Sequence, residues 1–197
     1  MCMPEPAKRY KYRDTLDWEG RLELIDGLAF NMTAAPSTGH QRAVVNLLVE
    51  LHTYLKGSSC EAFVAPFELR LSESEEYDNP DTVCQPDISV ICNPSQLDEK
   101  GCKGAPKLVI EVLSPSTAIK DRNEKFKIYQ RYGVEEYWIV DPVNQTIEVY
   151  GLEKGVYAKR EVFGKESELH FRFPRASDRI TGDTRLISRH PLPTTNP

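Results

Sequence analysis

The sequence lacks the features of membrane-spanning and secreted proteins. Its 197 residues contain no uninterrupted apolar run of about eighteen residues, so no transmembrane helix is indicated. The first residues do not show the basic and then apolar order of a signal peptide. These two absences favour a cytoplasmic protein with no membrane partner.

Cysteine is scarce and shows no metal-binding spacing. The five cysteines are an odd number and include no Cys-x-x-Cys pair. Cys84, Cys92 and Cys102 have the wrong spacing for a zinc site and no histidine nearby, which makes zinc the weaker interpretation. Free thiols in a reducing cytoplasm are the expectation.

An excess of positive charge is also missing. The chain carries 25 Lys and Arg against 30 Asp and Glu, a formal net charge of −5. Tight, non-specific DNA binding needs a basic surface for phosphate contacts, so the charge argues against that class. It leaves room for a nuclease with a local basic patch.

The order of the expected elements predicts one α/β domain. Asp26-Gly27 between two apolar runs predicts an N-terminal β-hairpin, and helical spacing of apolar residues follows from Val44 to Leu55. Strands are expected at 83–92, 107–113 and 135–140, and a helix ending near residue 132 joins the last two as a parallel pair. The expected boundaries are a lead-in at 1–13, a folded domain at 14–168 and a weakly ordered tail at 169–197.

Two acids stand inside apolar runs that are typical of buried strands. Asp87 lies in Gln85-Pro86-Asp87-Ile88-Ser89-Val90, and Glu111 lies in Lys107-Leu108-Val109-Ile110-Glu111-Val112-Leu113. A buried carboxylate is costly unless it is compensated. If the strands are neighbours, both carboxylates can bind one Mg²⁺, which accepts one or two carboxylates. Taken singly, Asp87 fits equally well an acid in a turn or at a strand start after proline, and Glu111 fits equally well an edge position that points to solvent.

Lys125 adds a third ionisable group to this pair. At 100° per residue it falls inside the apolar arc of the helix after Glu111. The arc consists of Ile119, Phe126, Tyr129 and Tyr132. The opposite, solvent-facing side is expected to hold Lys120, Lys127 and Arg131. An inward lysine needs a buried acid or a route for its ammonium to reach water, and both interpretations stay open.

His40 and Glu23 are weaker candidates. His40 lies one turn before Val44 on the inward side of the first expected helix, where most histidines are hydrogen-bonded core residues or caps. Glu23 stands beside the Asp-Gly turn, where a surface strand position is the commoner interpretation.

An ordered string of motifs resembles the Uma2 family of restriction-endonuclease-like proteins over about residues 14–165. The motifs are Leu22-Glu23-Leu24-Ile25-Asp26-Gly27, Pro36 with His40-Gln41, Gln85-Pro86-Asp87, Glu111-Val112-Leu113-Ser114-Pro115-Ser116-Thr117, Asp121 with Lys125 and Tyr129, and Gly133-Val134-Glu135-Glu136-Tyr137-Trp138-Ile139-Val140-Asp141-Pro142. The resemblance implies the PD-(D/E)XK superfamily: a restriction-endonuclease-like α/β core with a central mixed sheet flanked by helices. It also implies that Asp87 and Glu111 bind the metal.

One position departs from the superfamily pattern. The usual lysine, two residues after the second acid, is Leu113 here. The family resemblance instead places the lysine on the following helix, at Lys125, and makes His40 and Glu23 supporting site residues. The sequence after about residue 165 does not resemble the family's usual ending.

Three functions follow as hypotheses. The first is a Mg²⁺- or Mn²⁺-dependent endonuclease that hydrolyses DNA, with Asp87, Glu111 and Lys125 as catalytic residues. The second is a non-catalytic module of the same fold that binds nucleic acid or protein, favoured by the acidic charge and the displaced lysine. The third is a subunit whose activity needs another chain. An exposed edge strand in the N-terminal hairpin also favours a homodimer.

Overall fold

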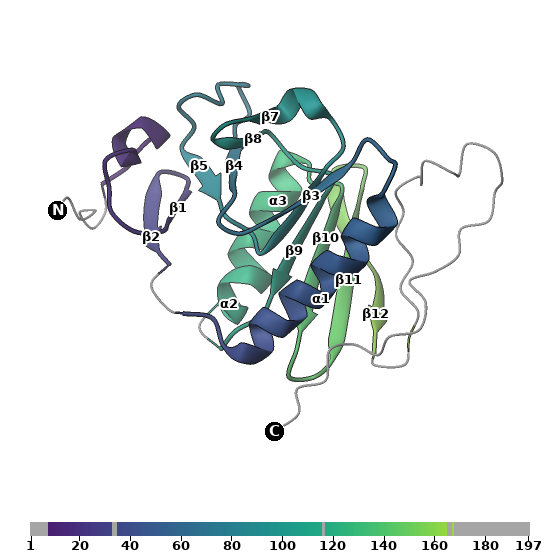
Figure 1. Ribbon diagram of the computed structural model, residues 1–197. Helices are drawn as coiled ribbons and strands as arrows, with labels where there is room; N and C mark the ends of the chain where they lie inside the picture. The colour runs from purple at the N-terminus through teal and green to yellow at the C-terminus, as the bar shows by residue number, and fades with distance from the viewer. Residues whose placement is uncertain (1–7, 33–34, 116, 165–166, 168–197) are drawn as a thin grey trace.

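Two six-stranded sheets form the frame of the part of the chain that the structure describes (Figure 1). The computed structural model describes residues 8–32, 35–115, 117–164 and 167. In spatial order, the first sheet contains β2 (Leu28–Asn31), β1 (Leu22–Ile25), β5 (Thr82–Cys84), β4 (Glu68–Leu71), β8 (Gly101–Lys103) and β7 (Leu97–Asp98). The second contains β12 (Val156–Phe163), β11 (Thr146–Glu153), β10 (Glu136–Asp141), β9 (Leu108–Val112), β6 (Ile88–Ile91) and β3 (Glu61–Val64).

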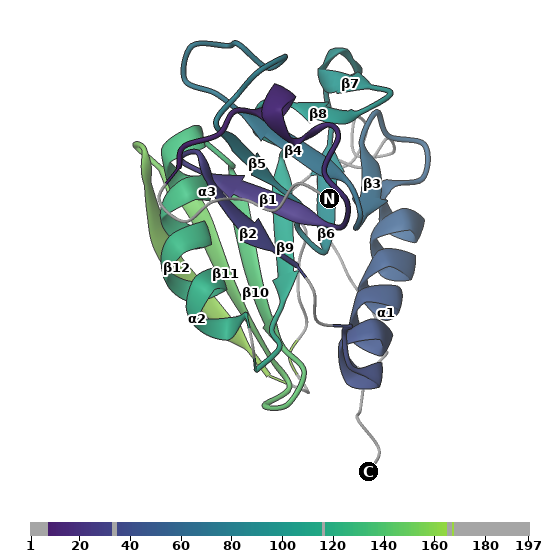
Figure 2. The same cartoon turned by 90° about the vertical axis from the view of Figure 1, so that its left-hand side faces the viewer.

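Helices cover both faces of the second sheet, as Figure 2 shows. On one face lies α1 (Thr38–Leu55), whose apolar stripe packs on Ile110 and Trp138. On the other lies a composite helix made of α2 (Ala118–Lys120), a π-helical turn (Asp121–Lys125) and α3 (Phe126–Tyr132). Short 3₁₀ helices occupy Tyr12–Thr15 and Pro94–Gln96. The predicted α/β fold with helices flanking a mixed sheet is therefore confirmed.

The predicted hairpin and parallel pair are both present. Asp26 and Gly27 have φ of 49° and 79° between β1 and β2, which matches the positive φ that a type I′ turn needs at both positions. Strands β9 and β10 run parallel, and the composite helix connects them. Gly133 ends that helix in the left-handed region, with φ of 82°.

The strand expected at 83–92 is two strands in two different sheets. β5 belongs to the first sheet and β6 to the second, and Pro86 stands between them. Proline has no N–H for the ladder, so hydrogen bonding stops there and the chain can change sheets. Asp87 consequently lies at the junction of the two sheets rather than in the middle of a strand.

Two cysteines expected to be free thiols are joined in a disulfide. Cys60 and Cys92 are bonded, with a Cα–Cα distance of 3.9 Å, because the register that pairs Glu61 with Ile91 places them opposite each other at the end of β3 and β6. Strand register is not visible in the sequence, which explains the wrong prediction. Cys84 and Cys102 are buried free thiols.

No helix among the described residues combines the length and apolar character needed to cross a bilayer. The expected tail at 169–197 and the first seven residues of the expected lead-in lie outside the described residues.

Candidate active site

Asp87 directly precedes β6, and Glu111 lies on the neighbouring strand β9. β6 and β9 are antiparallel, and their pairing ends with Ile88 opposite Ile110. Continuing that register by one residue places Asp87 opposite Glu111. Residues opposite each other in such a pair put their side chains on the same side of the sheet. The two acids expected to converge are therefore neighbours.

Two protein groups hold one oxygen of Asp87. The backbone N–H of Val112 donates to Asp87 Oδ2 over 2.8 Å, and His40 Nε2 lies 3.2 Å from the same oxygen. Ser37 caps the N-terminus of α1 by accepting a hydrogen bond from the His40 backbone, which fixes the first turn of the helix beside Asp87. His40 thus contacts a predicted metal ligand.

Glu111 also uses one oxygen for its contacts with the protein. Lys125 Nζ lies 2.7 Å from Glu111 Oε1, and the Tyr129 hydroxyl donates to the same atom over 2.8 Å. Glu111 is 4% exposed. Burial raises its pKa and outweighs the ammonium of Lys125, with further upward contributions from Asp121 and Asp87.

Lys125 is the centre of a buried group of carboxylates. Its ammonium lies 2.9 Å from Glu23 Oε1 and 3.7 Å from Asp121 Oδ1, in addition to the contact with Glu111. Burial alone would lower the pKa of Lys125, but the three carboxylates outweigh it and raise the pKa well above the ordinary value. Lys125 is therefore a charged, buried ammonium, and its predicted inward orientation is confirmed. Ile119, predicted on the same arc, is instead 80% exposed, because the π turn lies between it and the rest of the arc.

Glu23 binds two lysines at once. Lys120 Nζ lies 2.7 Å from Glu23 Oε2, Lys125 takes Oε1, and the backbone N–H of Gln85 donates to Oε1 over 3.0 Å. Glu23 is 1% exposed, although the sequence favoured a surface position. Burial would raise its pKa, but Lys125 and Lys120 outweigh that effect and lower it to about 2. Glu23 is thus a buried carboxylate anion.

The sequence pattern did not predict Lys120 as a site residue, and it contained Asp121 only as part of a family motif. The 100° wheel put Lys120 on the solvent-facing side, but an i→i+5 turn holds one more residue than an α-helical turn and brings residues five apart onto the same side. Lys120 and Lys125 therefore both reach Glu23. Asp121 is 2% exposed, and its Oδ1 accepts no hydrogen bond from the described residues. The periodicity of the sequence carries no signal for the π turn.

We call Glu23, Glu111, Lys120, Asp121 and Lys125 the acid–lysine cluster. Within the described ranges, the hydrogen bonds of Asp87 fall on Oδ2 and those of Glu111 on Oε1, so Asp87 Oδ1 and Glu111 Oε2 remain for a cation. In the part of the chain that the structure describes, no group of three or more His, Cys, Asp or Glu side chains is placed to hold a metal ion. Mg²⁺ uses one or two carboxylates and keeps several waters, so this pair of acids fits it.

The thiol of Cys84 is unsuited to act as a nucleophile beside the cluster. Cys84 is fully buried, and burial raises the pKa of its thiol. A thiol that stays protonated is a poor nucleophile. The chemistry of the cluster is therefore that of carboxylates and ammonium groups.

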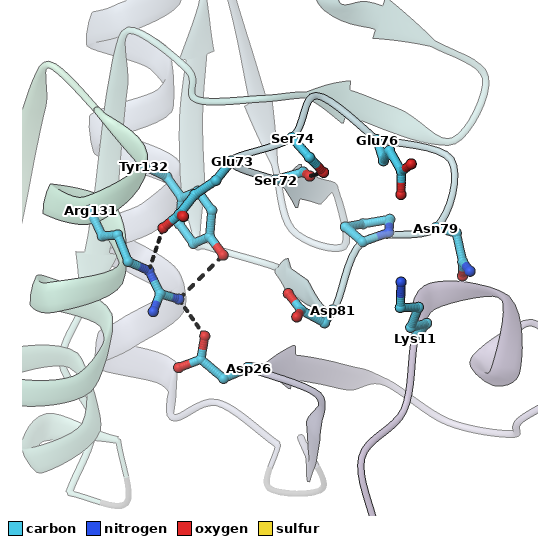
Figure 3. A pocket seen from close by; sticks show the side chains of 11 residues that line it. Lys11, Asp26, Ser72, Glu73, Ser74, Glu76, Asn79, Asp81, Arg131 and Tyr132 are labelled. Atoms are coloured by element: carbon cyan, nitrogen blue, oxygen red, sulfur yellow. Dashed lines mark hydrogen bonds and ion pairs between the residues drawn. The ribbon is translucent and has the colours of Figure 1, made fainter.

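A separate cavity of about 390 Å³ lies between the end of α3 and the loop after β4 (Figure 3). Its lining is polar and includes four acids and two basic residues, and Arg131 binds Asp26 and Glu73 within it. The lining residues are Lys11, Asp26, Ser72, Glu73, Ser74, Glu76, Asn79, Pro80, Asp81, Arg131 and Tyr132. None of them belongs to the acid–lysine cluster.

Residues 11–177 match the model of the family Uma2, described as "Putative restriction endonuclease". The chain belongs to the Uma2 family. Two relatives in Synechocystis sp. are uncharacterized proteins: slr1290 is 29% identical over 74% of this chain and 75% of its own, and sll1609 is 30% identical over 85% and 92%. The resemblance found in the sequence motifs is confirmed.

A solved structure shares the fold. It is described as a putative nuclease belonging to DUF820 from Anabaena variabilis, and it matches with a TM-score of 0.60 at 21% identity, over 81% of this chain and 84% of that chain. This match confirms the nuclease-like fold of the Uma2 chain. The catalytic and metal-binding roles of Asp87, Glu111, Lys125, His40 and Glu23 stay predictions.

Proposed function

We propose that this Uma2 protein is a Mg²⁺- or Mn²⁺-dependent endonuclease that hydrolyses phosphodiester bonds of DNA. One observation carries the proposal: the register of β6 and β9, continued by one residue, puts Asp87 opposite Glu111, and each acid has one carboxylate oxygen bound by the protein and one left for a cation, with the buried ammonium of Lys125 on Glu111. Membership of a family of restriction-endonuclease-like proteins supports the same reaction class.

Asp87 and Glu111 would hold the metal through Oδ1 and Oε2. The bound cation would supply charge neutralisation at the phosphate and a lower pKa for the attacking water. Val112 and Tyr129 donate hydrogen bonds to the other two oxygens, and these bonds would orient the two carboxylates for the metal. This orientation reduces the reorganisation needed during the reaction.

Lys125 would stabilise the negative charge that develops on the phosphate in the transition state. Its ammonium keeps its charge because three carboxylates surround it. A fixed charge in a water-poor site stabilises a transition state more than the same charge in bulk water. His40 would act as a positioning residue for Asp87, because it reaches the oxygen opposite the proposed metal-binding one.

Plasmid cleavage tests the proposal directly. Supercoiled DNA is incubated with the wild-type protein in Mg²⁺, in Mn²⁺ and in EDTA, and nicked and linear products are measured. Cleavage is expected with either metal, none in EDTA, and none with Glu111→Gln. Glu135→Gln is the matched control, because Glu135 is exposed and outside the cluster. No cleavage by the wild type under any of these conditions would refute the endonuclease activity.

The same experiment, combined with a DNA-binding assay, distinguishes the endonuclease from the non-catalytic alternative. A protein that binds DNA in a mobility-shift assay but leaves it intact with both metals would be a nucleic-acid-binding module of the nuclease fold. The acids that line the cavity in Figure 3 account for part of the negative net charge without involving the proposed site. A DNA substrate is consistent with the cytoplasmic location expected from the sequence.

A further inference from the structure

The two lysines of the acid–lysine cluster differ in their access to solvent. The Lys125 side chain is 4% exposed, and the side chain of Lys120 is 21% exposed. The ion-pair partners of Lys125 are all buried carboxylates. Both lysines bind the same carboxylate, that of Glu23, through its two different oxygens. Lys125 therefore belongs to the interior of the site and Lys120 to its opening.

The ammonium of Lys120 is oriented but not saturated. It donates to Glu23 Oε2 over 2.7 Å and lies 4.3 Å from the centre of the Phe30 ring. An ammonium has three N–H donors, and these two contacts leave one for a ligand at the exposed side. Phosphate oxygens are strong acceptors for such a donor.

The local backbone brings Lys120 to this place. In a regular α-helix, residues five apart lie on different sides, and Lys120 would point away from Glu23 when Lys125 points toward it. The π turn at Asp121–Lys125 puts both lysines on one side. Such turns are rare, and they occur frequently at functional sites.

Both carboxylate oxygens of Glu23 have protein partners, whereas Asp87 and Glu111 each use one oxygen. Oε2 accepts from Lys120, and Oε1 accepts from Lys125 and from the backbone of Gln85. A metal at Glu23 would therefore compete with two ammonium groups for the carboxylate. Its contacts are those of a group that fixes the distance between two ammonium groups.

We propose that Lys120 binds a phosphate of the nucleic-acid substrate, and that Glu23 is a positioning residue that holds Lys120 at the opening of the site and Lys125 inside it. This inference rests on the proposed endonuclease function, because it assigns the substrate phosphate to a particular side chain. The net charge of the chain is −5, so binding of a phosphate needs a local positive group, and Lys120 would be such a group.

Salt-dependent DNA binding tests the role of Lys120. A fluorescently labelled duplex is titrated with protein in EDTA, and again in Ca²⁺, at several salt concentrations from 50 to 200 mM. Losing one phosphate contact lowers the slope of log K against log [salt] by about 0.9, so the affinity advantage of wild type over Lys120→Met should shrink about 3-fold across this range. Lys120→Arg, which keeps the charge, should restore the wild-type slope.

Lys127→Met is the matched control, because Lys127 is an exposed lysine on the same composite helix and should not change the slope. A thermal melt checks that each variant is folded. If Lys120→Met does not fold, Lys120→Gln keeps a donor for Glu23 and takes its place. Equal slopes for the wild type and the Lys120 variant would overturn the inference and leave the proposed function standing. Wild-type protein that binds no DNA would overturn both.

Steady-state cleavage kinetics test the positioning role of Glu23. Lys120→Met should raise KM with kcat within about 2-fold, since a remote phosphate contact contributes uniform binding. Lys125→Met should lower kcat, and Glu23→Gln should change both constants because it releases both lysines. A Glu23→Gln enzyme that is folded and has wild-type KM and kcat would refute the positioning role.

Discussion

Glu111 and Lys125 form an ion pair of 2.7 Å although their side chains are only 5% and 4% exposed. A buried pair of this kind is costly to form and much costlier to break, because removing one partner leaves the other charged in a low-dielectric interior. Lys125 compensates three carboxylates rather than one. The cluster therefore links the stability of the fold to the chemistry of the site.

Lys125→Met should destabilise the fold by about 3–5 kcal/mol, because it leaves three buried acids without their counter-ion. Urea denaturation in EDTA measures the free energy of unfolding. Mn²⁺ should raise the thermal midpoint of this variant more than that of the wild type, because a divalent cation can replace the missing charge. Lys127→Met is the control, and a loss below about 1 kcal/mol in Lys125→Met would contradict the compensation described here.

Metal binding should depend on Asp87 and Glu111 together. Calorimetric titration with Mn²⁺ should show binding to the wild type, and Asp87→Asn or Glu111→Gln should each weaken it by roughly tenfold or more. Glu135→Gln should bind like the wild type. Unchanged affinity in both site variants would show that the cation binds elsewhere.

The sequence carried enough information to find the acids and the inward lysine. The apolar run around Glu111 predicted its burial, and the helical arc predicted the orientation of Lys125. Asp87 is only half-buried, with 21% of its side chain exposed, because it precedes β6 instead of lying inside it. The position of Lys120 could not be predicted, because the π turn at Asp121–Lys125 breaks the helical period and no local pattern of the sequence encodes that turn.

The sequence also did not predict the register of the strands or the sheet to which each strand belongs. The disulfide between Cys60 and Cys92 depends on a pairing of β3 with β6 that no local pattern encodes. The division of 83–92 between two sheets was signalled by Pro86, but a proline alone does not say where the chain goes next. Long-range pairing therefore decides the features that local periodicity leaves open.

The stability contributed by Glu23 should disappear in acid. Its pKa is about 2 in the folded protein against an ordinary value of 4.5, so the stabilisation is present above pH 4.5 and is lost as the pH falls toward 2. The shift corresponds to about 3 kcal/mol. The difference in unfolding free energy between wild type and Glu23→Gln should be largest at neutral pH and should shrink below pH 4.5. This difference isolates Glu23 from Glu111, whose pKa moves upward. A pH-independent difference would contradict the assignment.

Homodimerisation through the N-terminal hairpin stays a prediction. β2 stands at the end of its sheet in the described part of the chain, and Leu28 on it is 36% exposed. Light scattering at micromolar concentrations should give twice the 22.4 kDa chain mass, and Leu28→Lys should shift the mass toward the monomer. Val143→Lys, at an exposed position on another strand connection, is the control. A monomer mass for the wild type would exclude the dimer.

His40 should report on the charge and occupancy of Asp87. Burial alone would lower the pKa of His40, but the hydrogen bond and charge of Asp87 outweigh it and raise the pKa above 6.5. NMR titration of the imidazole should therefore give a pKa above 6.5 in the wild type and a lower pKa in Asp87→Asn, where the charge of Asp87 is removed and burial still acts. Because the folded-state pKa is the higher one, the charged pair stabilises the fold below about pH 6.5, and this contribution is lost as the pH rises through the folded pKa.

Adding Mg²⁺ to the wild type should lower the pKa of His40, because a cation on Asp87 Oδ1 competes with the imidazolium for the same carboxylate. The exposed His52 on the same helix is the internal reference. A His40 titration that responds to Asp87→Asn but not to Mg²⁺ would mean that the two side chains interact as described while the metal binds away from Asp87. That result would remove Asp87 from the ligand set and leave the hydrogen bond intact.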